Sequence, residues 1–539
     1  MKLRHIVVLT TFLAFFTVPS KEQISSGGVP LSLQDPSALK FQVPVEVMPA
    51  VDVLKLRAED SVNDNEIAVP WRFGAVIPLS MDMKNAGVWE ILPDGNRIWR
   101  LGIQSKGALT INLTFDRFFM PHGATFFEYT PDRKQVIGAF TDFNNRADSV
   151  FATTLLRGDE IILEYDEPAE CPVHGVIRLK GVTHGYRDSF LYMQNRYFDN
   201  SHMPDRDFGD SQWCNNNVHC LEAADWQDQV RSVVLTMVGG SYWCSGALVN
   251  NTYQDGTPYI LTAEHCYTDP STWVFWFNWE SPTCENPLSP PGYNSISGAS
   301  LVAKSGYSDF CLLKLSSVPP ASYNVYYAGW NRSTVPATSG AGIHHPMGDI
   351  KKISYTGLPF IDSTVFLWEV LWQDGITESG SSGAPIFDQH RLIVAGEHGG
   401  YHNCNSSRKW VLNGKFCVSW DYGSTPDKRL KEWLDPLGTN PDTLHGWDPN
   451  TISLTGLIIP TVNIFPNPGT GKFRIVLENN NISGMEIRIM DLQGRIIHYQ
   501  IVDNKNEGEF DLSWAGAGVY FAAIRTARDN IIKKLIINR

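Results

Sequence analysis

The chain has 539 residues, which at roughly 100 to 200 residues per domain excludes a single small binding module and leaves room for about three or four domains. Hydrophobic residues make up 43% of it and charged residues only 19%, a balance that excludes a disordered chain. Acidic residues outnumber basic ones by 57 to 44, and no run of Lys and Arg interrupts the resulting net charge of −13. This charge excludes an extended phosphate-binding surface, so no nucleic-acid partner is expected.

The N-terminus has the layout of a secretory signal peptide. The basic residues Lys2 and Arg4 precede an apolar run over residues 6–18, and Pro19 and Ser20 follow it. The run is too short to cross a hydrocarbon core of about 30 Å, and no later apolar run reaches the roughly 18 residues required. Residues 1–20 are therefore predicted to be a signal peptide of an exported protein without a transmembrane anchor.

Short runs of alternating apolar and polar residues fill the chain from about residue 44 to residue 182. The period of two is plain over residues 97–103, 110–115 and 160–165, and turn residues separate the runs. This pattern predicts an all-β sandwich. The alternation ends over residues 183–208, which are predicted to be a connection and a candidate processing region.

Eight of the nine cysteines lie in one third of the chain. In an oxidising compartment such clustering predicts a disulfide framework. No CxxC pair and no HExxH motif occurs, so neither a metal site nor a cofactor is expected. The ninth cysteine, Cys171, lies outside the cluster. The eight are Cys214, Cys220, Cys244, Cys266, Cys284, Cys311, Cys404 and Cys417.

Three local patterns in the cysteine-rich segment carry the residue types of nucleophilic acyl transfer. His265 ends an apolar strand pattern, Asp309 begins another, and Ser382 lies in a turn flanked by glycines. A hydroxyl nucleophile needs a neutral imidazole to take its proton and a buried carboxylate to orient that imidazole. The backbone amides of Gly380 and Ser382 are the candidates for binding the oxyanion. Gly383 allows a sharp turn behind the nucleophile.

The remaining segments contain one predicted helix and a second group of strands. Thr425 as N-cap and Pro426 at the first helical position begin a helix that carries Leu430, Trp433 and Leu434 on one face. Glycine, proline and asparagine then mark a break over residues 437–450. From residue 462 to the end, alternating runs predict a small β-sandwich.

These motifs together resemble the active-site motifs of chymotrypsin-fold serine endopeptidases, and more narrowly those of bacterial lysyl endopeptidases. The resemblance spans about residues 213–447, so a protease domain is expected over residues 209–447, and it implies two six-stranded β-barrels with the site between them. His265 would be the general base, Asp309 its orienting carboxylate and Ser382 the nucleophile.

The family's disulfide bonds, carried over to this chain, pair Cys214 with Cys404, Cys220 with Cys284 and Cys244 with Cys266. Cys311 and Cys417 have no counterpart in the family pattern. We expect these two to pair with each other, since the strand after Asp309 should run near the last strand of the second barrel.

The residue preference of the site is left open by the sequence. The trypsin-type acid position, six residues before Ser382, is Ile376, and residues 408–415, where the lysyl family supplies its Asp, contain no acid. An apolar pocket formed by Ile376 and Val411, or recognition of an acidic side chain by Arg408 or Lys409, is an equal alternative to lysine. The resemblance places Glu397, His398 and Gly399 on the segment that pairs with the substrate backbone, with His398 lining a subsite.

The last unit, residues 462–539, resembles the C-terminal sorting domain of the type IX secretion system of Bacteroidetes. This resemblance implies passage through the periplasm and across the outer membrane, contact with that machinery, and a cell-surface or secreted product. Residues 21–208 would then be a β-rich propeptide with its linker, and residues 448–461 a second linker.

Two functional hypotheses follow. The first is a secreted serine endopeptidase, made as a zymogen, that hydrolyses proteins or peptides through an acyl-enzyme. The alternative is a weakly active or inactive surface adhesin on a protease fold, which would have no need of all three catalytic groups.

Overall fold

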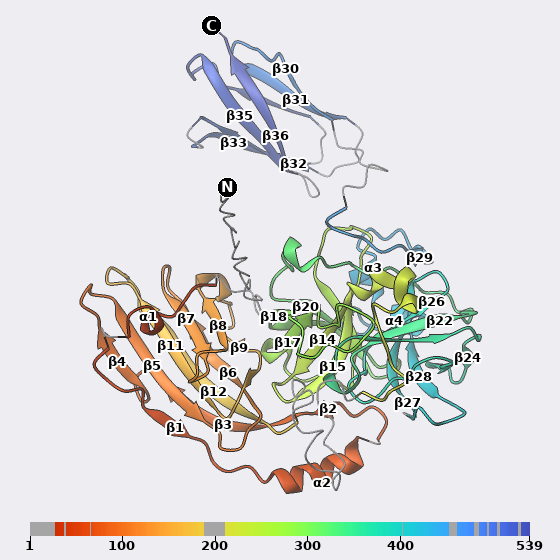
Figure 1. Ribbon diagram of the computed structural model, residues 1–539. Helices are drawn as coiled ribbons and strands as arrows, with labels where there is room; N and C mark the ends of the chain where they lie inside the picture. Colours follow the sequence, from red (N-terminus) through yellow and green to blue (C-terminus); the bar gives the residue numbers. More distant parts are fainter. Residues whose placement is uncertain are drawn as a thin grey trace, which may run out of the picture. The chain divides into compact units, whose positions relative to one another are not determined.

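The computed structural model describes residues 27–36, 39–64, 66–187, 211–400, 403–451, 461–478, 484–492, 495–503, 507–525 and 530–538. The predicted signal peptide and most of the candidate processing region lie outside these residues. The chain divides into two compact units, residues 1–450 and 451–539, and each is described by itself (Figure 1). Within the described part, no helix is long and apolar enough to cross a membrane.

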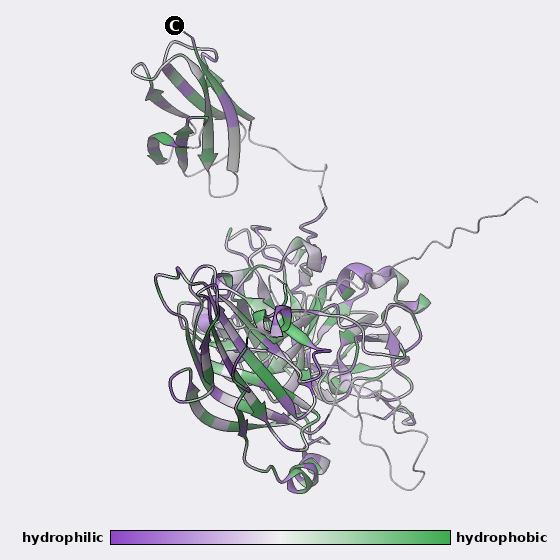
Figure 2. Cartoon of the chain, turned by 60° about the vertical axis from the view of Figure 1, so that its left-hand side comes forward, coloured by the Kyte–Doolittle hydropathy of each residue, from purple (hydrophilic) through white to green (hydrophobic). Residues whose placement is uncertain are grey.

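The N-terminal part of the first unit is a β-sandwich, as the alternating pattern predicts. One sheet has the order β1-β5-β11-β7-β8 with β4 on β5, and the other has the order β10-β6-β12-β3 with β9 on β6. Apolar side chains from both sheets form a single core between them. The hydropathy of its strands alternates accordingly (Figure 2), because successive residues of a strand face opposite sides.

The bounds of its elements are α1 (Leu31–Gln34), β1 (Val45–Val47), α2 (Val53–Asn63), β2 (Trp71–Arg72), β3 (Gly74–Asp82), β4 (Val88–Ile91), β5 (Arg97–Gln104), β6 (Thr110–Phe119), β7 (Thr125–Tyr129), β8 (Val136–Phe140), η2 (Asp142–Asn144), β9 (Phe151–Ala152), β10 (Leu156–Arg157), β11 (Glu160–Glu167) and β12 (Val176–Gly185). The helix α2 was not expected. It begins at Asp52, whose side chain accepts a hydrogen bond from the Lys55 amide and so caps the first turn.

The second part of the first unit begins with a closed barrel of six strands. Its order is β18-β17-β14-β15-β16-β20-β19. Only Gly298 separates β18 from β19, so these two edges are one bent strand and the sheet closes on itself. The short strand β2 adds to β15 from outside. The strands are β14 (Val233–Val238), β15 (Tyr242–Leu248), β16 (Tyr259–Ala263), β17 (Val274–Phe277), β18 (Asn294–Ser297), β19 (Ala299–Ser305) and β20 (Phe310–Leu315).

A second six-stranded barrel follows, with the order β23-β22-β26-β27-β28-β25. It closes where Tyr355, in β23, forms an antiparallel bridge with Asp374, just beyond β25. Its strands are β22 (Gly340–His344), β23 (Lys352–Thr356), β25 (Leu367–Leu371), β26 (Pro385–Asp388), β27 (Ile393–Gly400) and β28 (Trp410–Lys415). The two barrels expected from the resemblance are therefore present.

The remaining short elements of this part are β13 (Asn216–Asn217), η3 (Leu221–Trp226), α3 (Gln227–Val230), η4 (Pro270–Thr272), η5 (Ala321–Tyr323), β21 (Trp330–Asn331), η6 (Pro346–Gly348), β24 (Ile361–Asp362), α4 (Phe416–Asp421), η7 (Pro426–Lys428), α5 (Lys431–Leu434) and β29 (Thr443–Leu444). The single helix predicted from Thr425 is wrong. Pro426 does begin a helical turn, but Arg429 is extended, with φ −154° and ψ 165°, and this divides the segment into η7 and α5.

The C-terminal unit is a small β-sandwich, as predicted. Its two sheets have the orders β30-β31-β34 and β33-β32-β35-β36, and an apolar core lies between them. The strands are β30 (Thr461–Phe465), β31 (Lys472–Glu478), β32 (Gly484–Met490), β33 (Ile496–Asp503), β34 (Glu507–Asp511), β35 (Gly518–Arg525) and β36 (Asn530–Ile537).

Candidate active site

His265 and Asp309 are brought together by two neighbouring strands of the first barrel. β16 ends and β20 begins at the antiparallel pair of Ala263 with Phe310, so the residues just beyond each end are neighbours. The Glu264 amide donates to the Asp309 carbonyl at 3.0 Å and extends this pairing. Asp309 has φ +52°, a conformation uncommon outside glycine, which ends the strand pairing at this residue.

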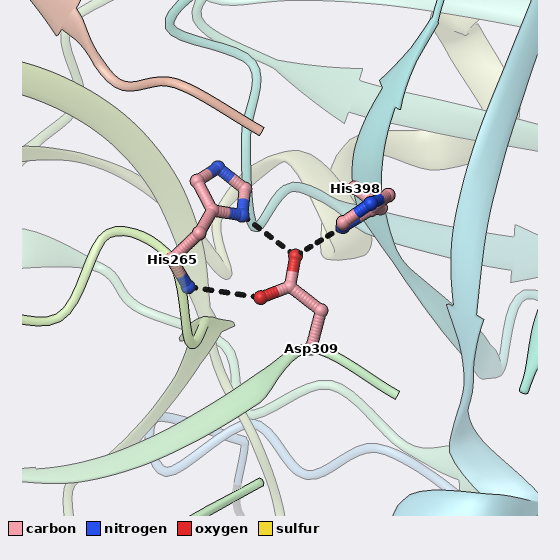
Figure 3. Close-up of side chains that lie close together, drawn as sticks. All are labelled: His265, Asp309 and His398. Carbon is pink, nitrogen blue, oxygen red and sulfur yellow. Dashed lines mark hydrogen bonds and ion pairs between the residues drawn. The ribbon is translucent and has the colours of Figure 1, made fainter. Parts of the chain in front are cut away.

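The Asp309 carboxylate holds two imidazoles (Figure 3). Its Oδ2 lies 2.6 Å from Nδ1 of His265 and 2.6 Å from Nδ1 of His398, which comes from β27 of the second barrel. Oδ1 accepts a hydrogen bond from the His265 backbone amide at 2.9 Å. This arrangement places a proton on Nδ1 of each ring and leaves Nε2 of His265 as an acceptor. That Nε2 is buried and has no hydrogen-bond partner in the described part of the chain.

The charge of the site follows from these contacts. Burial opposes ionisation of Asp309, but hydrogen bonds from His265 and His398 outweigh it and lower the pKa of the carboxyl to about 2. Asp309 is thus an anion across the physiological range. It can stabilise a positive charge on His265, as a base that accepts a proton requires.

The ligand atoms of His265, Asp309 and His398 lie within 4.8 Å of one another, a spacing that also suits a metal ion. A zinc ion would need each imidazole nitrogen at about 2.0–2.1 Å from itself. Here both nitrogens instead lie at hydrogen-bonding distance from the same carboxylate oxygen. Hydrogen bonding accounts for the cluster.

Ser382 lies in the loop between β25 and β26, against the first barrel. Its carbonyl accepts a hydrogen bond from the Ser245 amide at 2.8 Å, and the Ser245 hydroxyl donates to the Gly380 carbonyl at 2.9 Å. Ser245 of β15 therefore joins the loop to the barrel that carries His265. The amides of Gly380 and Ser382 donate to no other group among the described residues.

Both the backbone conformation and the close packing at position 383 require a glycine. Its φ is +82°, and a Cβ atom there would lie 2.3 Å from Oγ1 of Thr262 and 2.5 Å from the Ala263 amide nitrogen. Any side chain would push the Ser382 loop away from the end of β16. Gly383 thus lets the Ser382 loop pack closely against the end of β16, the strand that leads to His265.

One further residue, His344, positions the loop and was not expected at the site. His344 Nδ1 lies 2.8 Å from the hydroxyl of Ser381, the residue before the nucleophile, and His344 Nε2 lies 3.2 Å from the Ser354 hydroxyl. His344 is fully buried. The only sequence signal for it was its place in a His-His pair.

The disulfide framework is largely as expected. Cys214–Cys404, Cys220–Cys284 and Cys244–Cys266 are bonded. The expected pair of Cys311 with Cys417 is wrong, since both are free thiols. Cys311 is packed into the core of the first barrel, whereas Cys417 belongs to α4, beside the second barrel, and is only partly buried.

The other residues expected at the site are mostly buried. Ile376 and Val411 are fully buried, and Glu397 is 1% exposed. Arg408, the proposed reader of an acidic side chain, is instead a surface residue, with 64% of its side chain exposed and an ion pair to Glu369.

Two closed barrels, a His–Asp pair on the first, and a glycine-flanked Ser from the second together define a trypsin-like serine peptidase domain. Comparison with known proteins agrees. Residues 208–413 match the family model described as lysyl endopeptidase, C-terminal domain, and residues 463–538 match the model described as secretion system C-terminal sorting domain. Both resemblances inferred from the sequence are confirmed.

The individual proteins that this chain resembles share 27% or less of its sequence over the aligned residues. A lysyl endopeptidase of Pseudomonas aeruginosa is 27% identical over 334 residues, which cover 57% of this chain and 68% of that protein. A solved structure of a Glu endopeptidase in complex with MPD is 20% identical, with a TM-score of 0.25, and covers 34% of this chain and 85% of its own. Kallikrein-related peptidase 10 in complex with Zn²⁺ is 14% identical, with a TM-score of 0.26, and covers 35% of this chain and 91% of its own.

Proposed function

We propose that the protein is a secreted serine endopeptidase that is made as a zymogen. The observation that carries this proposal is the shared Asp309 carboxylate, which orients His265 and leaves its Nε2 buried without a partner, in the segment that also holds Ser382. An imidazole in this state is a ready proton acceptor for a neighbouring hydroxyl.

The reaction follows from the groups present. Ser382 Oγ attacks the carbonyl carbon of the peptide bond while His265 Nε2 takes the hydroxyl proton, and Asp309 stabilises the imidazolium. The amides of Gly380 and Ser382 donate to the oxyanion. His265 then gives its proton to the leaving amine. A water molecule, deprotonated by the same nitrogen, hydrolyses the acyl-enzyme and restores Ser382.

Two contacts support the zymogen. The Ser379 hydroxyl, three residues before the nucleophile, donates to the Asp64 carbonyl at 2.9 Å. On the other side of the site, a Cβ atom at Gly399 would lie 2.8 Å from Ile67 Cγ2 and 3.1 Å from the Ala68 amide nitrogen. Asp64, Ile67 and Ala68 therefore lie against the two segments that carry Ser382 and His398, and we propose that this part of the chain blocks the substrate until residues 21–208 are removed.

Export is supported by the two ends of the chain. The signal-peptide pattern of residues 1–20 would direct the chain to the periplasm, and the sorting-domain match over residues 463–538 supports passage through the type IX machinery. We propose residues 209–447 as the peptidase, with linkers on both sides, and protein or peptide substrates as its partners.

The test is active-site labelling of the processed enzyme by a fluorophosphonate, with Ser382→Ala as the matched control. We expect labelling of Ser382, cleavage of denatured protein, and a loss of at least ~10³-fold in turnover for the variant. The unprocessed chain should label much more slowly if residues 64–68 block the site. Turnover that survives Ser382→Ala would refute the catalytic assignment. The absence of both labelling and cleavage in the processed protein would favour the adhesin hypothesis.

A further inference from the structure

A short segment of the N-terminal part lies against both barrels of the peptidase. At Gly399, in β27, a Cβ atom would stand 2.8 Å from Cγ2 of Ile67 and 3.1 Å from the Ala68 amide nitrogen, so the chain passes directly over this strand. Shortly after Ala68, Trp71 pairs with Trp243 of β15 in antiparallel register (Figure 1). The chain therefore passes from the second barrel to the first over the few residues between these two contacts.

The edge of β15 is open where this segment binds. β14 pairs with β15 on one side, and on the other side β16 pairs with the last two residues of β15, which leaves the beginning of the strand to β2. The Ser241 carbonyl accepts a hydrogen bond from the Phe73 amide at 2.9 Å and continues the pairing. Nε of Arg72 donates to Oδ1 of Asp60 at 2.8 Å, which ties the same segment to α2. The segment is thus fixed from both sides.

The nucleophile lies between the two strands that this segment joins. The Gly383 amide donates to the Glu397 carbonyl of β27 at 2.8 Å, and the Ser382 carbonyl accepts from the Ser245 amide of β15 at 2.8 Å. The three peptide units between the contacts with β27 and β15 span at most about 11 Å, which leaves no length for a detour. The segment therefore crosses the catalytic site.

The direction of the crossing is that of a substrate. His265 must give its proton to the leaving amine, so the residues that follow a cleaved bond lie on the side of His265. The next residue, Cys266, is bonded to Cys244 of β15, which places β15 on this leaving side. The segment reaches β27 first and β15 second, as a substrate would. The bond in the middle of the crossing joins Val69 to Pro70, which are both half-buried.

Proline is unsuited to be the first residue after a cleaved bond. Its nitrogen carries a ring carbon in place of a hydrogen, and its φ is fixed at about −65°. During cleavage this nitrogen must come within hydrogen-bonding distance of His265 Nε2 to receive the proton, and the ring carbon crowds that approach. A segment with proline at this position can bind as a substrate does without being cut.

We propose that residues 67–72 inhibit the peptidase by crossing its catalytic site in the direction of a substrate, with the Val69–Pro70 bond at Ser382. Pro70 protects this bond, so the N-terminal part stays intact while it blocks the site. This inference rests on the proposed endopeptidase function and zymogen, and it names the bond through which the site is regulated. The proline alone would then separate an inhibitor from a substrate.

The test uses the unprocessed full chain with Pro70→Ala, incubated alone and analysed by mass spectrometry for a new N-terminus at position 70. Position 69 is varied at the same time (Val69 kept, Val69→Lys, Val69→Glu, Val69→Leu and Val69→Phe), so that the preference for the residue before the bond does not decide the result. In at least one background we expect a cut between positions 69 and 70, at a rate independent of protein concentration. The same background with Pro70 kept should be cut there at least ~100-fold more slowly, the smaller end of what proton transfer contributes to catalysis.

Pro78→Ala is the matched control, because Pro78 is an exposed proline of β3 in the same part of the chain. It should leave the chain intact, and adding Ser382→Ala to a cut variant should abolish the cut. Fluorophosphonate labelling after processing reports a folded, competent enzyme in every variant. Labelled enzyme would overturn this inference alone if every Pro70→Ala form stays intact, is cut at another bond of residues 66–72, or is cut no faster than with Pro70 kept. Enzyme that neither labels nor cleaves would overturn the proposed function as well.

Discussion

Two glutamates of the peptidase segment that are largely shielded from solvent, Glu280 and Glu397, are held in opposite ways. Glu280, just beyond β17, receives the ammonium of Lys351 at 2.7 Å, and although burial opposes its ionisation, Lys351 lowers the pKa of Glu280 to about 2. Glu397, on β27, forms no ion pair with a Lys or Arg in the part of the chain that the structure describes; burial raises its pKa to about 8 despite the Thr377 hydrogen bond, and the Asp309 charge adds to the rise. In the first region a neighbouring cation keeps the acid ionised, and in the second burial without a cation favours the protonated acid.

Removing the cation from the first region should have the largest effect on stability. Lys351 is 1% exposed, so Lys351→Met removes the buried ammonium and leaves Glu280 with the 3.4 Å contact to His219. We expect the free energy of unfolding to fall by about 3–5 kcal/mol, measured by denaturant unfolding of the full chain in a Ser382→Ala background. Adding Glu280→Gln should restore part of the loss. An unchanged midpoint would show that this pair is not stabilising.

Removing the acid from the second region should have the opposite sign. The pKa of Glu397 in the folded protein, about 8, lies above its ordinary value of 4.5. Its contribution to stability is therefore fully present below pH 4.5 and is lost as the pH rises through 8. Glu397→Gln should gain about 2 kcal/mol over the parent at pH 8 and nothing at pH 4. A variant less stable than the parent at pH 8 would make Glu397 a structural residue.

The His–Asp–Ser motifs could be found from sequence because each is local. His265 and Asp309 each stand at the end of an apolar strand, and Ser382 stands between glycines, so residue types and order were sufficient. The same holds for the strands over residues 97–103, 110–115 and 160–165, which became β5, β6 and β11.

The unpaired burial of Glu397 could not be found in this way. Its significance depends on a hydrogen bond from a residue 20 positions earlier and on the absence of a cation, neither of which leaves a pattern in the chain. The predicted disulfide bond between Cys311 and Cys417 was wrong for a related reason. Strand order suggested proximity, but the direction of the Cys311 side chain, into the first barrel, decided the outcome.

If the chain is a zymogen, as we propose, the contact between the sandwich and the first barrel would affect the timing of its activation. Trp71 and Phe73 share one apolar core with Trp243 and Trp276, and Phe73 stacks on Trp243 with ring centroids 4.6 Å apart. Cutting the connection over residues 183–208 removes a covalent link but none of these contacts. The nicked chain would remain a tight complex of two pieces, so the appearance of activity would follow dissociation or further degradation of the smaller piece, with a delay after the first cut.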